Sequence, residues 1–402
     1  MPTIFISAGE ASGELYGAQL ASLLRQNLPQ AELFGMGGER MRAAGVDCIV
    51  RAEDMAVMGL TEVLEHLPRI YGEFRKLRRA IRERRPQEAV LIDFPDFHFH
   101  LFREFHRLGI PVIYVVSPQL WAWKKHRIRQ VQKYVRRMLV IFPFEEQFYR
   151  DRGVKAEFVG HPLAELPPPT ISREDFARAN SLDPAKTWIA LLPGSRMREI
   201  RDHLPTMLDA ARALAQSQPS RHFEFLIPLA PTLHAEQRAQ VASLIAAHAG
   251  ALTVCLIPGQ ARSALFHSRA SVTASGTATV EAALIGNPFV VVYRVSSLTY
   301  AIAKRVVDVP HVAMVNLIAG RRVVPELIQH DFTAQNIVRH LEPLLPDGPP
   351  RESMIQALTA VRQALAAHPR QQGHQGAIDR VAAVVMEELE TAVPATQKSV
   401  RT

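Results

Sequence analysis

The sequence is poor in the features that mark secreted or membrane-spanning proteins. Two cysteines, Cys48 and Cys255, occur in 402 residues, so a disulfide framework is excluded, and no pair or cluster has zinc-ligand spacing. No apolar run reaches the roughly 18 residues of a membrane span. The N-terminus has no basic stretch followed by an apolar one, so no signal peptide is expected. These absences favour the reducing cytosol.

The sequence also lacks the standard nucleotide-binding signatures. In the first loop Gly9, Gly13 and Gly17 are spaced four apart, which is not G-x-G-x-x-G, and no P-loop lysine is present. A dehydrogenase or an NTPase is therefore disfavoured. Glycine here still lets a ligand approach the backbone at a helix N-terminus. Glu10 and Glu14 favour a hydroxyl-rich ligand over a phosphate, and a tight turn without a ligand is an equal alternative.

The chain does contain an ordinary globular composition and an uneven distribution of charge. With 48% hydrophobic and 21% charged residues, its length suggests two large domains. The net charge is +8, but residues 69–85 hold eight Lys or Arg against two Glu, and residues 124–137 hold seven and no acidic residue. We therefore expect the N-terminal half to meet an anion: nucleic acid, a phosphate-bearing substrate or a membrane surface.

The order of strand-like and helical patterns predicts two successive α/β domains. Strands are expected at 3–7, 31–35, 89–93, 112–117 and 138–142, and again at 188–192, 223–227, 252–257, 271–273 and 289–293. This alternation favours two Rossmann-like domains that face a central cleft, with C-terminal helices. The expected boundaries are 1–165, 166–335, 336–390 for helices that pack back on the first domain, and 391–402 for a disordered tail.

Two carboxylates follow the strand expected at 89–93. Asp93 is expected to be the better buried of the two, which raises its pKa and suits a general base. Asp96 is interpreted as a cap of the following helix. The next loop, 117–123, contains Trp121 and Trp123, which can stack on a sugar or an acyl chain or, more commonly, fill a gap between helix and sheet. Gln119 in this loop is a substrate-binding candidate.

The second domain opens with a turn that suits an anion. Gly194, Ser195 and Arg196 stand at the start of a helix expected at 199–216. Backbone amides, the helix dipole and the guanidinium can together bind a diphosphate. The alternative is a serine cap beside a surface arginine. His161, at the boundary between the domains, is more often structural than catalytic when it stands alone.

A second hydroxyl-rich helix start lies further along the same domain. It comprises Ser275, Gly276 and Thr277. Glu281, about one turn into the helix, can accept hydrogen bonds from two ribose hydroxyls, or it only completes a capping arrangement. Asn316 and Arg321 lie in a later loop and can add a further anion contact. No Asp-x-Asp ends a strand of this domain, so no metal cofactor is expected.

An apolar stripe between residues 60 and 81 coincides with the first basic segment. Such a pairing is typical of an interfacial membrane helix, and equally of a core-facing helix with a solvated basic side. Pro68 interrupts the stripe, so only Arg69–Arg84 need form one helix. The candidate lipid contacts are Leu64, Leu67, Tyr71, Phe74, Arg75 and Arg78.

An ordered set of motifs resembles one glycosyltransferase family of Gram-negative bacteria, the lipid-A-disaccharide synthases. The motifs cover most of the first 330 residues: AGEASGE (8–14), MAVMGLTEVL (55–64), DFPDF (93–97), YVVSPQLWAW (114–123), PFEEQFY (143–149), FVGHPL (158–163), LLPGSRMREI (191–200), SGTATVEAAL (275–284) and NLIAGRRVVPEL (316–327). The family usually has Asp at the position of Glu14 and Pro at the position of Val315.

The resemblance implies a glycosyltransferase-B fold and an inverting reaction. UDP-2,3-diacylglucosamine and lipid X, which is 2,3-diacylglucosamine 1-phosphate, would give lipid A disaccharide 1-phosphate and UDP. The resemblance assigns Asp93 to the general base and Glu10 to the acidic position of the first loop, where Ser12 and Gly13 are substrate-binding candidates. It assigns the nucleotide side to Arg196, Glu281, Asn316 and Arg321.

The resemblance also implies a place and a set of partners. Lipid substrates predict peripheral association with the cytoplasmic face of the inner membrane, and a homodimer is left open. Two other functions are considered: a UDP-sugar 2-epimerase of the same architecture, and a nucleic-acid-binding protein that uses the two basic segments. No nucleic-acid motif is present, so no nucleic-acid partner is expected.

Overall fold

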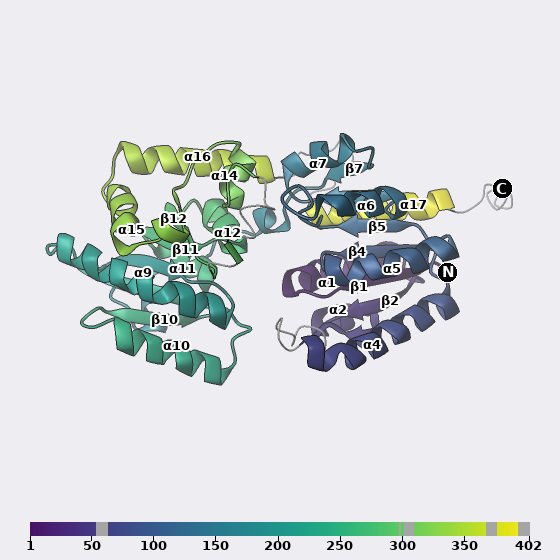
Figure 1. Ribbon diagram of the computed structural model, residues 1–402, viewed down its shortest axis with the longest axis horizontal. Helices are drawn as coiled ribbons and strands as arrows, with labels where there is room; N and C mark the ends of the chain where they lie inside the picture. The colour runs from purple at the N-terminus through teal and green to yellow at the C-terminus, as the bar shows by residue number, and fades with distance from the viewer. Residues whose placement is uncertain (54–62, 297–298, 301–308, 367–375, 393–402) are drawn as a thin grey trace. The chain divides into compact units, whose positions relative to one another are not determined.

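The computed structural model describes residues 1–53, 63–296, 299–300, 309–366 and 376–392 (Figure 1). The chain forms two compact units. Unit 1 is Met1–Glu165 together with Leu365–Thr402, and unit 2 is Leu166–Ala364.

Unit 1 is built on a parallel seven-stranded sheet in the order β3-β2-β1-β4-β5-β6-β7. Its strands are nearly continuous apolar runs, as expected where both faces of a parallel sheet are covered. Their bounds are β1 Thr3–Ala8, β2 Glu32–Gly37, β3 Asp47–Arg51, β4 Glu88–Ile92, β5 Val112–Val115, β6 Arg137–Val140 and β7 Ala156–Phe158.

Helices cover both faces of this sheet and create two cores. One core lies under α4, α5, α6 and α7, and the other lies under α1, α2 and α17 (Figure 1). The helices are α1 Ala11–Asn27, α2 Glu39–Ala43, α4 Val63–Arg84, α5 Pro95–Leu108, α6 Ile128–Tyr134, α7 Pro143–Arg150 and α17 Ala377–Ala392, with short 3-10 turns at Lys125–Arg127 and Pro162–Glu165.

Unit 2 repeats the plan with a parallel six-stranded sheet in the order β10-β9-β8-β11-β12-β13. Its strands are β8 Thr187–Leu192, β9 Phe223–Leu229, β10 Val254–Pro258, β11 Ala270–Ala274, β12 Phe289–Tyr293 and β13 Glu326–Ile328. Its helices are α8 Arg173–Asn180, α9 Met197–Ser217, α10 Ala235–His248, α11 Ala261–His267, α12 Thr277–Ile285, α14 Met314–Ala319, α15 Ala334–Leu341 and α16 Pro349–Leu365, with 3-10 turns at Gln329–Asp331 and Glu342–Leu344.

The predicted fold class of two Rossmann-like α/β domains is confirmed, and the misses lie at the sheet edges. Three strands were not predicted: β3, β7 and β13, each the last strand of its sheet. An edge strand is only partly covered: β3 is exposed at both ends and buried only at Val50, so it offers no long apolar run. Helix α4 begins at Val63 and runs through Pro68, six residues earlier than the pattern required.

The C-terminal helices are divided between the units. Helices α15 and α16 belong to unit 2, whereas α17 packs on α1 and β4 of unit 1. On α17, the 5% exposed carboxylate of Glu388 pairs with the 6% exposed guanidinium of Arg137 at 3.1 Å. The tail expected at 391–402 contributes Thr391 and Ala392 to the end of α17, and its remainder lies outside the described residues.

Many of the lysines and arginines in the two basic segments form ion pairs within unit 1. Ion pairs join the first segment to carboxylates on other elements, and they join the second segment to α5, β7 and α17. The pairs are Arg78–Glu104, Arg82–Glu104, Arg84–Glu32, Arg84–Asp47, Lys124–Asp96, Arg127–Asp96, Arg136–Glu388, Arg137–Glu157 and Arg137–Glu388. These residues have carboxylate partners within unit 1, and the contact of the two segments with an external anion stays a prediction.

Candidate functional site

The candidate residues of each unit gather where the strand order reverses. In unit 1 the neighbours β1 and β4 lead into the loops that contain Glu10 and Asp93. In unit 2 the neighbours β8 and β11 lead into the loops that contain Ser195 and Gly276. The carboxyl ends of parallel strands at such a reversal are the usual ligand-binding edge of an open α/β sheet.

Asp93 is held in a left-handed backbone conformation by two hydrogen bonds. Its φ is +51° and that of Phe94 is +50°. The Tyr114 hydroxyl donates to the Asp93 carbonyl oxygen at 2.6 Å, and His98 Nδ1 donates to the same oxygen at 2.6 Å. The opposite ring nitrogen, Nε2, therefore accepts from the Ser7 hydroxyl, 2.8 Å away. This conformation costs about 1–3 kcal/mol per residue and is typical of functional sites.

The Asp93 carboxyl has the electrostatic character of a general base. Burial, and secondly the negative charge of Glu10, raise its pKa to about 7, against a hydrogen bond from the Phe94 backbone. Glu10 itself is exposed at the start of α1. Burial lowers the pKa of His98 to about 4, so this ring is neutral and keeps the tautomer that the Asp93 carbonyl selects. A carboxyl with a pKa near neutrality can accept and release a proton.

Glu145, on α7, is a second buried carboxyl that was not singled out from the sequence. It accepts hydrogen bonds from the Ser117 hydroxyl at 2.6 Å and from Trp121 Nε1 at 3.0 Å. Burial raises its pKa to about 7, and the charge of Asp93 contributes to this shift. The available signal was a glutamate at the third position of a helix that follows a strand. This signal is ambiguous, because a glutamate at that position also suits a helix cap.

The two tryptophans of the 117–123 loop have different surroundings. Trp121 is tied to Glu145 and lies edge-on to Phe144, with ring centroids 5.1 Å apart. Trp123 is 43% exposed, and the Lys124 ammonium lies 4.2 Å from its ring centroid. Gln119 is exposed in the same loop. Trp121 therefore fills a gap, as the more common alternative predicted, and Trp123 and Gln119 are accessible to a ligand.

Packing requires a glycine at Gly9 in the first loop, and Gly13 is buried. A Cβ on Gly9 would lie 2.3 Å from the Phe94 ring, whereas a Cβ on Gly13 would make ordinary contact, 3.5 Å from the Ile92 carbonyl oxygen. The substrate contact expected for Gly13 stays a prediction, and Ser12 is exposed. The Glu14 carboxylate accepts from the Arg40 and Met41 amides at 2.7 and 3.3 Å, so this residue fixes the start of α2.

Two expectations for residues on or against α5 are also corrected: the helix cap at Asp96 and the lipid contact of Phe74. Phe94 is the N-cap of α5, and the Asp96 carboxylate pairs with Lys124 at 3.1 Å and Arg127 at 2.6 Å instead of capping the helix. Phe74 packs into the core against Phe97, with ring centroids 5.7 Å apart.

The remaining lipid-contact candidates on α4 differ in accessibility. Arg78 pairs with Glu104 at 2.5 Å, and its expected lipid contact stays a prediction. Tyr71 is 60% exposed and Arg75 is exposed beside it, with its guanidinium 5.9 Å from the Tyr71 ring centroid. Leu64 and Leu67 lie on α4, but their side chains fall outside the described residues, as does most of the motif at 55–64.

The turn after β8 already contains a carboxylate. Glu199 Oε2 accepts from the backbone amides of Ser195 and Arg196 at 3.0 and 3.3 Å. The Arg196 guanidinium is largely exposed and 3.4 Å from Glu199. The buried His203 anchors this turn through the Pro193 carbonyl oxygen at 2.7 Å, a role that no sequence spacing indicated. The two amides are thus not open to a diphosphate while Glu199 caps them.

The start of α12 is more open. Its N-cap is Gly276, with φ +151°, and a Cβ placed there would meet no atom within 4 Å. Gly276 and Thr277 are exposed, no acidic residue occupies the first turn, and Ser275 lies beside them. Glu281 sits one turn in, and burial raises its pKa against the charge of Arg262. An uncapped helix start without a carboxylate favours an anionic ligand.

Asn316 is a structural residue in this chain. Its side-chain nitrogen donates to the Val324 carbonyl at 3.0 Å and to Glu326 at 2.8 Å, and its side-chain oxygen accepts from the Val323 and Val324 amides. It is fully buried, so its expected contact with an anion is corrected. These bonds fix the loop in which Arg321 is exposed. Val315 is buried beside Asn316.

Two searches of the described part of the chain bear on cofactors and membranes. No group of three or more His, Cys, Asp or Glu side chains there is placed to hold a metal ion. No helix there combines the length and apolar character needed to cross a membrane.

Solved structures with a similar two-domain fold include a glycosyltransferase and a UDP-GlcNAc 2-epimerase. The S. aureus MnaA–UDP co-structure matches with a TM-score of 0.64 at 14% identity, over 97% of each chain. CalG4, the calicheamicin glycosyltransferase, matches with a TM-score of 0.57 at 17% identity, over 98% of this chain and 100% of that one. At these identities the likeness shows the fold alone.

Sequence relatives identify the family. The family model described as lipid-A-disaccharide synthetase matches residues 4–375. Lipid-A-disaccharide synthases from Acidobacterium capsulatum and Koribacter versatilis are 60% and 52% identical, over 90% and 91% of this chain and 92% and 94% of theirs. The chain belongs to the lipid-A-disaccharide synthetase family, and it is a glycosyltransferase.

Proposed function

We propose that the chain condenses UDP-2,3-diacylglucosamine with lipid X to give lipid A disaccharide 1-phosphate and UDP, with inversion at the transferred sugar. The name that the curated relatives share supports this reaction. The observation on the structure that carries it is the partly buried Asp93 carboxyl, whose pKa is raised to about 7 at the carboxyl edge of the unit 1 sheet.

In the proposed step, Asp93 accepts the proton of the acceptor hydroxyl as that oxygen attacks the anomeric carbon. The bond from this carbon to UDP breaks on the opposite face, and its electron pair goes to the diphosphate. A base with a pKa near 7 is deprotonated often enough to act and basic enough to accept the proton. Glu10, Ser12 and Gln119 are exposed around this edge and are proposed to contact the acceptor.

The UDP-sugar is proposed to bind to unit 2. The amides at the start of α12, with Ser275 and Thr277, would receive the diphosphate, and Glu281 would accept from the ribose hydroxyls. Arg196 and Arg321 are exposed cations that would neutralise the departing UDP. Residues 1–165 thus form the acceptor side and 166–335 the nucleotide side of the proposal.

Peripheral contact with the cytoplasmic face of the inner membrane is proposed through Tyr71 and Arg75. An exposed aromatic ring beside an exposed cation suits an anionic lipid surface. Tyr71→Ser should reduce flotation with phosphatidylglycerol vesicles, while Arg79→Gln, at an exposed site paired with Glu83, should not. Equal flotation of both variants would contradict the contact.

The deciding experiment is a product assay with UDP-2,3-diacylglucosamine and lipid X, with each omitted in turn. Disaccharide 1-phosphate and UDP should form in equal amounts, and only when both substrates are present. Conversion of UDP-N-acetylglucosamine alone to its 2-epimer, without a disaccharide product, would contradict the proposal.

A further inference from the structure

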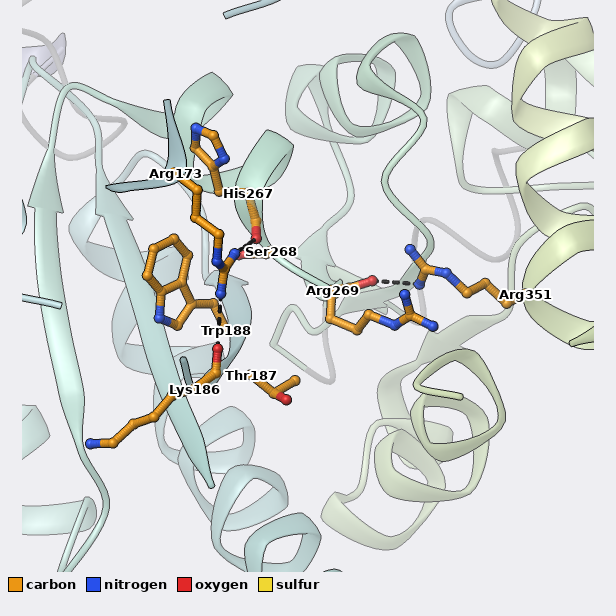
Figure 2. A pocket seen from close by; sticks show the side chains of 8 residues that line it. All are labelled: Arg173, Lys186, Thr187, Trp188, His267, Ser268, Arg269 and Arg351. Atoms are coloured by element: carbon orange, nitrogen blue, oxygen red, sulfur yellow. Dashed lines mark hydrogen bonds between the residues drawn. The ribbon is translucent and has the colours of Figure 1, made fainter. Parts of the chain in front are cut away.

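A cavity lies at the amino-terminal edge of the unit 2 sheet, where β8 and β11 begin. Its volume is about 310 Å³ (Figure 2). It is lined by Arg173, Lys186, Thr187, Trp188, His267, Ser268, Arg269 and Arg351, and we call it the amino-end pocket. The loops with Ser195 and Gly276 follow the opposite ends of these strands, so a β8 of six residues separates the two regions by roughly 20 Å.

The lining of the amino-end pocket carries four cations and no carboxylate. Lys186 pairs with Glu224 at 3.2 Å, and Arg269 pairs with Asp347, whose side chain is 89% exposed, at 2.5 Å. Arg173 donates to three backbone carbonyl oxygens, and among the described residues no carboxylate lies within ion-pair distance of its guanidinium. Two of the four charges therefore have carboxylate partners outside the lining, and one of those partners is solvated.

Arg351 lies directly beside Arg269 in this wall. Its Nη1 donates to the Arg269 backbone carbonyl at 2.6 Å and to that of Leu344 at 3.0 Å (Figure 2). No carboxylate pairs with Arg351 among the described residues. Burial, and secondly the charge of Arg269, lower the pKa of Arg351. Two guanidinium groups side by side repel each other, and an anion between them would remove that cost.

The pocket wall also contains an unused hydrogen-bond donor. Ser268 is 6% exposed, and its hydroxyl has no hydrogen-bond partner among the described residues. A buried polar atom without a partner calls for a water molecule or a ligand. A neighbouring cavity of about 220 Å³ shares Thr187 and Arg269 and adds Arg221 together with Asp347, the carboxylate partner of Arg269.

We propose that the amino-end pocket binds a small phosphate-bearing anion, with Arg269 and Arg351 as its principal charged contacts. The volume accommodates one or two phosphate groups, and guanidinium groups match phosphate oxygens in a bidentate geometry. This site is separate from the proposed nucleotide site, because it is formed by the starts of β8 and β11 and not by their ends. A soluble phosphate and a lipid headgroup share this chemistry.

Titration calorimetry of the full chain with inorganic pyrophosphate, at constant ionic strength, tests the site. Arg351→Gln should weaken binding at least tenfold, because it removes a charge that no carboxylate of the described residues neutralises. Arg362→Gln, which removes an exposed arginine further along the same helix, should leave the affinity within twofold of wild type. Equal affinity in wild type and Arg351→Gln would overturn the proposal.

Two further variants serve as controls. Arg196→Ala distinguishes the amino-end pocket from the nucleotide edge, and Arg351→Lys distinguishes loss of charge from loss of folding. With UDP present at saturation to occupy the proposed nucleotide site, Arg196→Ala should keep the remaining pyrophosphate binding, and loss of this binding in Arg196→Ala with retention in Arg351→Gln would place the anion at the other end of the sheet and overturn the proposal. Arg351→Lys should keep most of the affinity, because it retains the charge. Displacement of pyrophosphate by phosphatidic acid vesicles would indicate a lipid headgroup, and displacement by glycerol 3-phosphate alone would indicate a soluble phosphate.

Discussion

In the loops that follow β4 and β5 of unit 1, positive-φ backbone positions are occupied by Asp93, Phe94 and Val116, whereas in the loops that follow β8 and β11 of unit 2 they are occupied by Gly194 and Gly276. A side chain in this conformation is strained, and glycine is not. Unit 1 therefore tolerates strain in order to aim a carboxyl group. Unit 2 uses glycine instead: Gly194 leaves room for the Glu199 carboxylate, and Gly276 leaves the start of α12 open.

The electrostatics of the two edges differ in the same sense. Unit 1 buries Glu145 and partly buries Asp93, and this burial raises the pKa of both to about 7. Unit 2 leaves Arg196 and Arg321 exposed, and the backbone amides at the start of α12 have no side-chain cap. One architecture thus prepares a proton acceptor in one copy and an anion receptor in the other, and each prediction below changes one edge while the other serves as its reference.

The largest effect is expected from Asp93→Asn. Removal of the base should lower kcat by about 10²–10⁴-fold, while UDP affinity in unit 2 stays unchanged. Steady-state kinetics and calorimetry with UDP measure the two quantities. Asp96→Asn is the matched control, because Asp96 is an exposed carboxylate three residues away that serves ion pairs. Turnover near the wild-type rate in Asp93→Asn would contradict the role of Asp93 as the base, and with it the proposed difference between the two edges.

The pH dependence of kcat/KM should reflect the protonation of the Asp93 carboxyl. Since the base acts in its deprotonated form, kcat/KM should fall about tenfold per pH unit below a pKa of about 7 and level off above it. Glu10→Gln should move this inflection to lower pH, because the Glu10 charge contributes to raising the pKa of Asp93. An inflection that moves to higher pH in Glu10→Gln would contradict the electrostatic coupling.

Gly276→Ala tests the opposite edge. Strain at φ +151° and a methyl group over the amides should weaken UDP binding by about tenfold, with kcat at saturating substrate little changed. Gly286→Ala is the control, because Gly286 ends the same helix at φ +80° and its Cβ would also meet no atom. Equal losses of UDP affinity in the two variants would show that helix strain, not ligand contact, is responsible.

Tyr114→Phe tests whether the hydrogen bond that holds the strained backbone of Asp93 contributes to turnover. It removes one of two donors to the Asp93 carbonyl, so kcat should fall a few-fold and the free energy of unfolding by about 1 kcal/mol. Tyr149→Phe loses a buried hydrogen bond to the Pro118 carbonyl at 3.0 Å and should show the stability loss with a smaller change in kcat. Identical kinetic effects would mean that Tyr114 only stabilises the fold.

The comparison also shows where sequence patterns are informative. Buried central strands and the loops after them were predictable, because apolar runs and Gly–hydroxyl clusters are local signals. The edge strand β3 and the anchor His203 were not, since partial burial and hydrogen bonds between distant segments leave no local pattern. Asn316 shows the converse case: its residue type suggested a ligand contact, and the fold uses all of its hydrogen-bonding groups.

The smallest expected effect concerns Glu199, the carboxylate that caps the turn after β8. Its Oε2 accepts from two amides of unit 2 that would otherwise favour an anion. Glu199→Gln keeps an acceptor for these amides and removes one negative charge, so UDP should bind about two- to threefold more tightly at low salt, and the gain should shrink as salt is added. Calorimetry at two ionic strengths measures this. Asp202→Asn, which removes an exposed charge on the same helix, is the control. Weaker UDP binding in Glu199→Gln at both ionic strengths would mean that Glu199 supports the nucleotide site instead of competing with its anion.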